Sequence, residues 1–245
     1  MDLGPYLAAI DEPPGRARRR KAEFDFLFGD DLLAGKSVLD IGAGSGKHSI
    51  YAAYAGASRV VALEPEVAGS TAGSTTRLTE AADMLGLDTR IRLVPATLQE
   101  YESEGEQFDI VLLNASINHL DEDACIRLPR DAEAQARYRR LFAKIAGLAR
   151  PGATLLAVDV APTNLFRTLR LKNPLVPTIE WEKHQPPNAW ASLLSDVGFA
   201  DPRVRWGVPN ILGSAGQTLL GSRAGAYLFA SVFRLRMTKT KAVEG

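Results

Sequence analysis

The sequence predicts an α/β fold of the doubly wound class, in which parallel strands form one sheet that helices cover on both faces. Short apolar, β-branched runs alternate with segments whose apolar residues recur at helical spacing. The first of these runs leads directly into the glycine-rich loop 42–46, an order typical of nucleotide-binding α/β proteins. A chain of 245 residues suits one core, so we expect a single domain over residues 1–245.

The N-terminal part of the chain is predicted to form a helical cap over residues 1–35. Prolines at positions 5, 13 and 14 predict an irregular start, and helical spacing predicts one helix from about residue 18 to residue 33, against the edge of the sheet. The basic run 16–21 opens this helix. It is interpreted as a solvated helix face or, alternatively, as a contact to an acidic acceptor.

From residue 37 to residue 160 the pattern alternates between strands and helices. Buried strands joined by helical crossovers predict parallel pairing. Segment 69–76 is poor in helix-forming residues, so the second crossover helix is expected to begin late. The predicted elements are strand 37–41, helix 47–55, strand 59–63, helical segment 66–85, strand 90–94, a short helix near Gln99, strand 108–113, helix 131–149 and strand 154–160.

The rest of the chain departs from this alternation. Residues 161–187 contain five prolines and are longer than an ordinary connection, which predicts an insertion on the substrate side. Asn188 is predicted to cap a helix that Gly198 ends. The last part is predicted as strand 202–206, a glycine-rich loop over 213–225, an antiparallel strand 227–236, and a disordered tail after Met237.

Composition narrows the classes of function. The chain has 29 Lys and Arg and 29 Asp and Glu residues, so no net field attracts nucleic acid or an anionic membrane. Cys125 is the single cysteine, which excludes an intramolecular disulfide and fits a reducing compartment. No stretch is apolar and long enough to span a membrane, and the N-terminus lacks the pattern of a signal peptide. We expect a cytoplasmic protein without membrane or nucleic-acid partners.

The stretch 37–48, together with Glu64, carries the strongest functional signal. A strand, a glycine-rich loop and a helix in this order let the backbone approach a ligand, with free amide groups facing it. An acid at the end of the second strand is where such folds bind the ribose of an adenosine cofactor. Lys47 is not followed by Ser or Thr, which argues against a P-loop, and the third glycine comes one residue early for a nicotinamide cofactor.

Further segments carry matching motifs: VLDIGAGSG at 38–46, VVALEP at 60–65, LVPATL at 93–98, FDIVLLNASINHL at 108–120, ARPGATLL at 149–156 and SDVGF at 195–199. As a set they resemble the class I S-adenosylmethionine-dependent methyltransferases over roughly residues 20–237. The resemblance implies a Rossmann-like, seven-stranded, mostly parallel sheet in the order 3-2-1-4-5-7-6 with strand 7 antiparallel. It implies S-adenosylmethionine as the cofactor and one methyltransferase domain.

The resemblance also implies which residues bind the cofactor. The acid and loop after the first strand would hold the methionine part, the acid after the second strand the ribose, residues 97–98 the adenine, and residues 114–116 the methyl-transfer side. The implied residues are Asp40, Gly42, Ala43, Gly44, Glu64, Pro65, Thr97, Leu98, Asn114, Ala115 and Ser116. Residues 114–117 read Asn-Ala-Ser-Ile rather than Asn-Pro-Pro-Tyr, which removes the support for methylation of a nucleobase or a glutamine amide.

Two of the three histidines are candidates for a catalytic base. A sulfonium already activates its methyl group, so the protein mainly aligns the acceptor, and a hydroxyl acceptor also needs a base. His119 follows the fourth strand beside acidic residues, and His184 lies in the 161–187 insertion; each is either a base or a structural residue. His48 is interpreted as a packing residue. No metal is expected, because the acids at 121–123 share one short loop.

The leading hypothesis is therefore methyl transfer to an oxygen or nitrogen atom of a small molecule, a saccharide or a secondary metabolite. Trp181 and Trp190 would either line its pocket or belong to the core. One alternative is a methyltransferase for RNA or protein, with the basic segments 16–21 and 234–241 as a clamp. Another is a binding module without turnover, or a nicotinamide-binding protein. The sequence leaves the oligomeric state open, with a homodimer among the possibilities.

Overall fold

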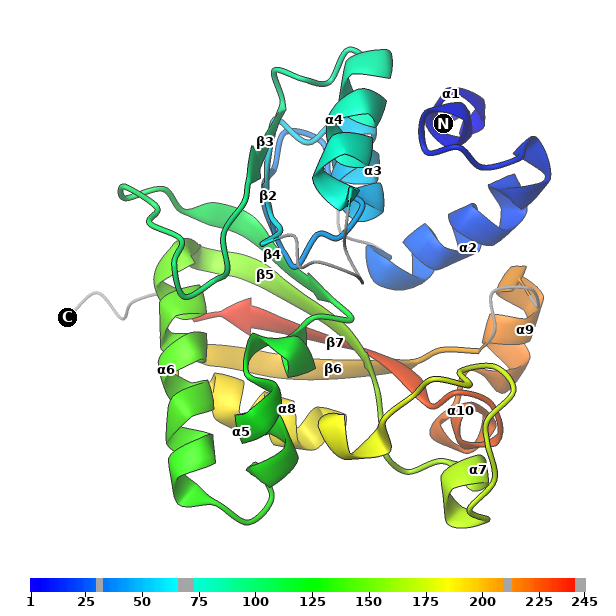
Figure 1. Ribbon diagram of the computed structural model, residues 1–245, viewed down its shortest axis with the longest axis vertical. Coiled ribbons are helices and arrows are strands. Elements are labelled where there is room, and N and C mark those ends of the chain that lie inside the picture. The colour runs from blue at the N-terminus through cyan, green and yellow to red at the C-terminus, as the bar shows by residue number, and fades with distance from the viewer. Residues whose placement is uncertain (30–32, 66–72, 209–212, 241–245) are drawn as a thin grey trace.

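The computed structural model describes residues 1–29, 33–65, 73–208 and 213–240. One seven-stranded sheet crosses the molecule in the order β3-β2-β1-β4-β5-β7-β6 (Figure 1). Its first five strands pair in parallel, and β7 is antiparallel to both β5 and β6. The strands are β1 Ser37–Ile41, β2 Arg59–Leu63, β3 Ile91–Val94, β4 Phe108–Asn114, β5 Ala149–Val160, β6 Phe199–Trp206 and β7 Val232–Lys239. The predicted fold class and strand order are confirmed.

The two faces of the sheet bury two separate hydrophobic cores. Successive strand residues point to opposite faces, so Val38 packs into one core and Leu39 into the other. Figure 1 shows α3 and α4 on one side of the sheet and α6 and α8 on the other. The helices are α1 Gly4–Ala9, α2 Ala17–Leu27, α3 Lys47–Tyr54, α4 Ser74–Met84, α5 Glu122–Arg127, α6 Ala132–Leu148, α7 Leu165–Thr168, α8 Pro187–Ser195, α9 Gly213–Leu220 and α10 Arg223–Leu228.

The N-terminal segment is more regular than expected, because α1 forms where an irregular start was predicted. Tyr6 of this helix is fully buried, and its ring meets the edge of Phe24 of α2 at 5.4 Å. Phe24 in turn stacks on Tyr51 of α3, with ring centroids 3.5 Å apart. The helix α2 therefore packs on α3 rather than along the edge of the sheet. Its far end reaches β7, where Arg234 donates to the carbonyl of Leu27.

Several other expectations need correction. The turn 98–100 replaces the short helix predicted near Gln99. Asn188 does not cap α8, because the helix begins one residue earlier at Pro187, whose fixed φ suits the first helical position. The glycine-rich segment expected as a loop holds α9 and α10. As a result the last strand begins only at Val232 and continues past Met237 to Lys239, while part of the predicted tail, 241–245, lies outside the described residues.

Candidate active site

The loop after β1 is held against the loop after β4 by close contacts between their backbones and one hydroxyl. Gly42 has a φ of +74°, and a Cβ atom on it would lie 2.7 Å from the Cβ of Ser116. The hydroxyl of Ser116 donates to the carbonyl oxygen of Ile41 at 2.5 Å. Only glycine combines this backbone angle with this approach at low cost. The ends of β1 and β4 are therefore fixed relative to each other.

Glu64, at the end of β2, binds the same glycine loop. Its Oε2 accepts a hydrogen bond from the backbone amide of Gly44 at 2.7 Å, and only 4% of the residue is exposed. A Cβ atom on Gly44 would meet no other atom within 4 Å, so the loop faces open space at this point. Ala43 bridges the strands as well, since its amide donates to the carbonyl of Leu63. An acid and an accessible backbone are thus brought together, as the sequence predicted.

Asp40 lies under this loop rather than on its surface. Its side chain accepts a hydrogen bond from Ser49 of α3 at 2.7 Å and is 1% exposed. Burial raises the pKa of the Asp40 carboxyl, an effect that the neighbouring His48 and the Ser49 hydrogen bond partly offset. The carboxyl group thereby anchors the first turn of α3 beneath the glycine loop. Its predicted contact with the cofactor stays a prediction.

The predicted adenine-side residues have different surroundings. Leu98 is 2% exposed and belongs to the core, whereas Thr97 uses its amide and its hydroxyl to bind the exposed Glu100. Pro65 is exposed directly after Glu64 and precedes the undescribed residues 66–72. Both segments follow the carboxyl ends of β2 and β3. The topology thus places them at the edge of the sheet that also carries the glycine loop.

Asn114, the last residue of β4, begins a set of polar contacts that extends to α3 and α2. Ala115 has a φ of +53°, and its amide donates to the carbonyl of Val158 in β5 at 2.8 Å. Such strain in a non-glycine residue persists only where the surroundings enforce it, and it is common at functional sites. Before it, Nδ2 of Asn114 lies 3.5 Å from Nδ1 of His48, and Nε2 of His48 lies 3.2 Å from Oε1 of Glu23. A polar chain therefore connects α2, α3 and β4.

Glu23 was missed in the sequence, and His48 was assigned to packing. His48 does pack edge-on against Phe24, at 6.2 Å between ring centroids, but it also joins the polar chain. The available signal was the position of His48 in the first turn after the glycine loop, since that turn faces the ligand side of such folds. The partner Glu23 could not be found in this way, because nothing local relates α2 to α3. Its pKa is lowered by His48 and Arg20, against the opposing effect of burial.

Beside Asn114 opens a cavity of about 460 Å³, which we call the acceptor-side cavity. It lies between α2 and the carboxyl ends of β4 and β5. Most of its walls are apolar, and its polar groups come from α2 and β4. The lining residues are Arg19, Glu23, Phe26, Leu27, Asn114, Val158, Leu175, Val176, Gly207, Val208, Ala230 and Val232. Leu175 and Val176 belong to the 161–187 segment that was predicted to lie on the substrate side.

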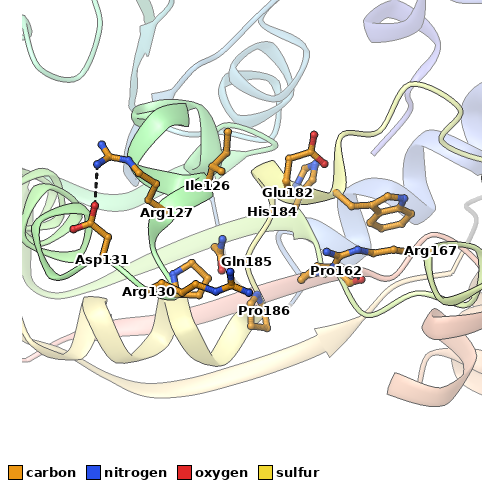
Figure 2. Close-up of a pocket in the computed structure, with 12 residues that line it drawn as sticks. Ile126, Arg127, Arg130, Asp131, Pro162, Arg167, Glu182, His184, Gln185 and Pro186 are labelled. Atoms are coloured by element: carbon orange, nitrogen blue, oxygen red, sulfur yellow. Dashed lines mark hydrogen bonds and ion pairs between the residues drawn. The ribbon is translucent and has the colours of Figure 1, made fainter. Parts of the chain in front are cut away.

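The two histidines predicted as bases lie elsewhere. The side chain of His119 is 53% exposed and binds Glu122, with Nδ1 2.6 Å from Oε1. His184 lies deeper, with Nδ1 2.8 Å from Oδ1 of the buried Asp159. It lines a second cavity of about 670 Å³ (Figure 2), which we call the arginine cavity after Arg127, Arg130 and Arg167 in its walls. Neither histidine lines the acceptor-side cavity.

Trp181 and Trp190 have different surroundings. Trp190 is fully buried in α8, with its ring 5.0 Å from that of Tyr138 and 6.0 Å from that of Phe142. It belongs to the core. Trp181, in the short 3-10 turn Trp181–Lys183, lines the arginine cavity. The long segment therefore contributes to a cavity, but the aromatic pair considered in the sequence does not form one.

Arg20 and Lys21 of the basic run form ion pairs with Glu23 and Asp25 within α2. No helix in the described ranges is long and apolar enough to cross a membrane. Across the same ranges, no group of three or more His, Cys, Asp or Glu side chains could hold a metal ion.

Comparison with known proteins identifies the family to which this chain is similar. A family model described as a methyltransferase domain matches residues 15–202. Among solved structures, an S-adenosylmethionine-dependent methyltransferase from Mesorhizobium loti is similar, with 17% identity, a TM-score of 0.60, and coverage of 89% of this chain and 98% of that one. One from Aquifex aeolicus has 15% identity and a TM-score of 0.59, covering 98% and 100%. N-methyltransferase NodS from Bradyrhizobium japonicum has 13% and 0.54, covering 93% and 97%.

Proposed function

This chain belongs to the S-adenosylmethionine-dependent methyltransferases, and we propose that it methylates an oxygen or nitrogen atom of a small molecule bound in the acceptor-side cavity. One observation carries the proposal: this cavity adjoins Asn114, which ends β4 and is the first of the residues predicted to line the methyl-transfer side. Its volume of about 460 Å³ falls within the range of small-molecule sites.

For the cofactor, we propose the residues that the sequence pointed to. The open space over Gly44 and the carboxylate of Glu64 beside it fit a ribose and an amino-acid moiety, because the backbone there can be approached closely. The predicted set would hold S-adenosylmethionine: Asp40, Gly42, Ala43, Gly44, Glu64, Pro65, Thr97, Leu98, Asn114, Ala115 and Ser116. When bound, this cofactor supplies an electrophilic methyl group. The protein then has to place the acceptor in line with it and exclude water.

The lining of the acceptor-side cavity favours an acceptor with an apolar body. Valine, leucine and phenylalanine side chains form most of the walls, and the hydroxyl groups of a saccharide would be left without partners against them. The polar side chains of the lining are Arg19 and Glu23 of α2 and Asn114 of β4. We therefore propose a metabolite with an apolar ring or chain that carries one polar nucleophile, rather than a saccharide.

The polar chain of Glu23, His48 and Asn114 is proposed to orient the nucleophile. If Nε2 of His48 donates to Glu23, its Nδ1 is an acceptor and holds the Nδ2 group of Asn114. The carbonyl oxygen of the Asn114 side chain is then the atom that can accept a hydrogen bond from an acceptor N–H or O–H. Asn114 would touch the substrate, whereas Glu23 and His48 act through it as positioning residues. Catalytic roles for His119 and His184 stay predictions that this proposal does not use.

The proposal is tested by methyl transfer from S-adenosylmethionine that carries an isotope label in its methyl group. The purified protein is incubated with pooled apolar phenols and amines, with sugars, and separately with RNA and with protein. We expect label in the phenol or amine fraction. Label found only in RNA or protein would refute the small-molecule proposal, and it would support the basic segments 16–21 and 234–241 as a clamp.

A matched pair of variants ties the activity to the cavity. Val158→Phe fills the acceptor-side cavity and should lower kcat/KM at least about tenfold through a raised KM for the acceptor, while S-adenosylmethionine binding by calorimetry stays unchanged. Val204→Phe adds the same atoms at an exposed position of β6 and should have no effect. Equal activity of the two variants would show that the acceptor binds elsewhere.

A further inference from the structure

His184, which lines the arginine cavity, is paired with the buried Asp159, and the proposed methyl transfer uses neither residue. Asp159 of β5 is 3% exposed, and its Oδ1 accepts hydrogen bonds from His184 and from the amide of Val160. Among the described residues its Oδ2 has no hydrogen-bond partner. Burying a carboxylate is costly unless it is paired. A ligand that binds to His184 in the cavity would give this buried pair a function.

This cavity is separate from the acceptor-side cavity. The two share no lining residue. Neighbouring residues of a strand point to opposite faces of the sheet, and Val158 lines the acceptor-side cavity while Asp159 faces His184. None of the residues predicted to bind the cofactor lines the arginine cavity. A ligand bound there would occupy a site of its own.

The charges of its walls favour an anion. Arg127 is neutralised by Asp131 at 2.8 Å. Arg130 and Arg167 form no ion pair with any carboxylate in the part of the chain that the structure describes, and Arg167 is held by the carbonyl of Pro162 at 3.0 Å. Figure 2 shows the Arg130 side chain reaching toward Pro186 and the Arg167 side chain ending beside Pro162, with Glu182 directed away from both. Two arginine side chains thus line one cavity.

His184 supplies a third donor of fixed orientation. Because its Nδ1 is held by Asp159, the ring is fixed, and Nε2 on the other side of the ring is left for a ligand in the cavity that His184 lines. When both ring nitrogens carry a proton, Nδ1–H donates to Asp159 and Nε2–H can donate to an anion. Trp181 adds an aromatic side chain to the lining of the same cavity. Two guanidinium groups and an imidazole N–H can donate to the several oxygen atoms of a phosphate group.

We propose that the arginine cavity binds the phosphate group of a small phosphorylated ring compound, with Arg130, Arg167 and Nε2 of His184 as donors. Trp181 contacts the ring. Asp159 is a positioning residue, since it acts through His184. The inference does not depend on the proposed function, because it assigns a second ligand and no step of methyl transfer.

The test uses phenyl phosphate as the probe and isothermal titration calorimetry on the full chain. We expect one site for phenyl phosphate, weaker binding of inorganic phosphate, and no binding of phenol. Replacing both arginines, Arg130→Gln with Arg167→Gln, should weaken phenyl phosphate binding at least about tenfold. Arg140→Gln, which removes an exposed arginine paired with Glu133, should leave it unchanged.

The histidine is tested separately. Asp159→Asn and His184→Gln should each weaken phenyl phosphate binding. If either of these variants fails to fold, the double variant Arg130→Gln with Arg167→Gln still tests the proposal. S-adenosylmethionine binding is measured on the same samples and should be unchanged in the arginine variants, so failure of the proposed function would be seen independently. Absence of phenyl phosphate binding up to about 10 mM, equal binding of phenol, or undiminished binding by the double arginine variant would each overturn the proposal.

Discussion

The backbone amide of Gly44 lies 2.7 Å from Oε2 of Glu64, so the end of β2 holds the glycine loop that follows β1. Glu64→Ala removes both this acceptor and the proposed ribose contact. We expect S-adenosylmethionine affinity to fall at least about tenfold, because a charge-assisted hydrogen bond is worth roughly 1.5–3 kcal/mol. Calorimetry measures it, with Glu102→Ala at an 88% exposed side chain as the control. Equal affinity of the two variants would contradict the proposed role of Glu64.

Gly42→Ala should destabilise the protein more than its backbone angle alone requires. Gly42 and Gly35 have nearly equal φ values of +74° and +73°, but a Cβ atom meets Ser116 at the first and open space at the second. Gly35→Ala is therefore expected to cost about 1 kcal/mol and Gly42→Ala about 2–4 kcal/mol. Urea unfolding gives both free energies. If the two costs are equal, the contact with Ser116 does not constrain the loop.

Asp40→Asn should stabilise the fold near neutral pH. Burial raises the pKa of Asp40 above its ordinary value of 3.8, so the folded state binds the proton more tightly than the unfolded state. Stability therefore falls as pH rises from the unfolded to the folded pKa, and the cost is full above the latter. The variant should be more stable than the wild type at pH 7 and nearly equal to it near pH 3.5. Thermal unfolding at both pH values measures this, and a gain that does not depend on pH would refute it.

Glu12→Gln should have the opposite pH dependence. Glu12 accepts hydrogen bonds from Arg20 at 2.7 Å and from Lys47 at 3.0 Å, and these lower its pKa to about 2. Its contribution to stability is complete above the ordinary value of 4.5 and is lost as pH falls toward 2.

We therefore expect Glu12→Gln to lose about 1–2 kcal/mol at pH 7. The loss should shrink as pH falls from 4.5 to 2. Urea unfolding at several pH values checks it, with Glu102→Gln as the exposed control. A loss that stays constant down to pH 2 would show that the effect is not ionic.

Cys125 should resist alkylation in the folded protein. The thiol is fully buried, its Sγ lies 3.1 Å from the carbonyl of Lys183, and burial raises its pKa to about 12. Because the thiolate is the reactive form, iodoacetamide at pH 8 should modify the folded chain at least about a hundredfold more slowly than the urea-unfolded chain. Mass spectrometry follows the reaction. Similar rates in the two states would mean that α5 opens readily.

Local patterns predicted the strands well and the C-terminal helices poorly. The first two strands have the predicted bounds, 37–41 and 59–63. A short apolar run between polar residues is too short for a helix and is typical of a buried strand. Segment 213–225 was predicted as a loop from its glycines and residues 227–228 as the start of the last strand, yet 213–228 holds α9 and α10. There Gln217 binds the backbone of Trp206 and Val208, and Ser222 caps α10. These contacts override weak helix propensity.

What the sequence determined by itself is the fold class and the meeting of the glycine loop with Glu64, while the strand order was implied by the family resemblance. The physical reason is that the carboxyl ends of adjacent parallel strands lie at one edge of a sheet, so residues that follow β1 and β2 must be neighbours. Only the tertiary structure brought Glu23 to His48 and Asp159 to His184. Such pairs depend on where a helix or a long segment crosses the sheet, and this is set by packing between elements that no local spacing encodes.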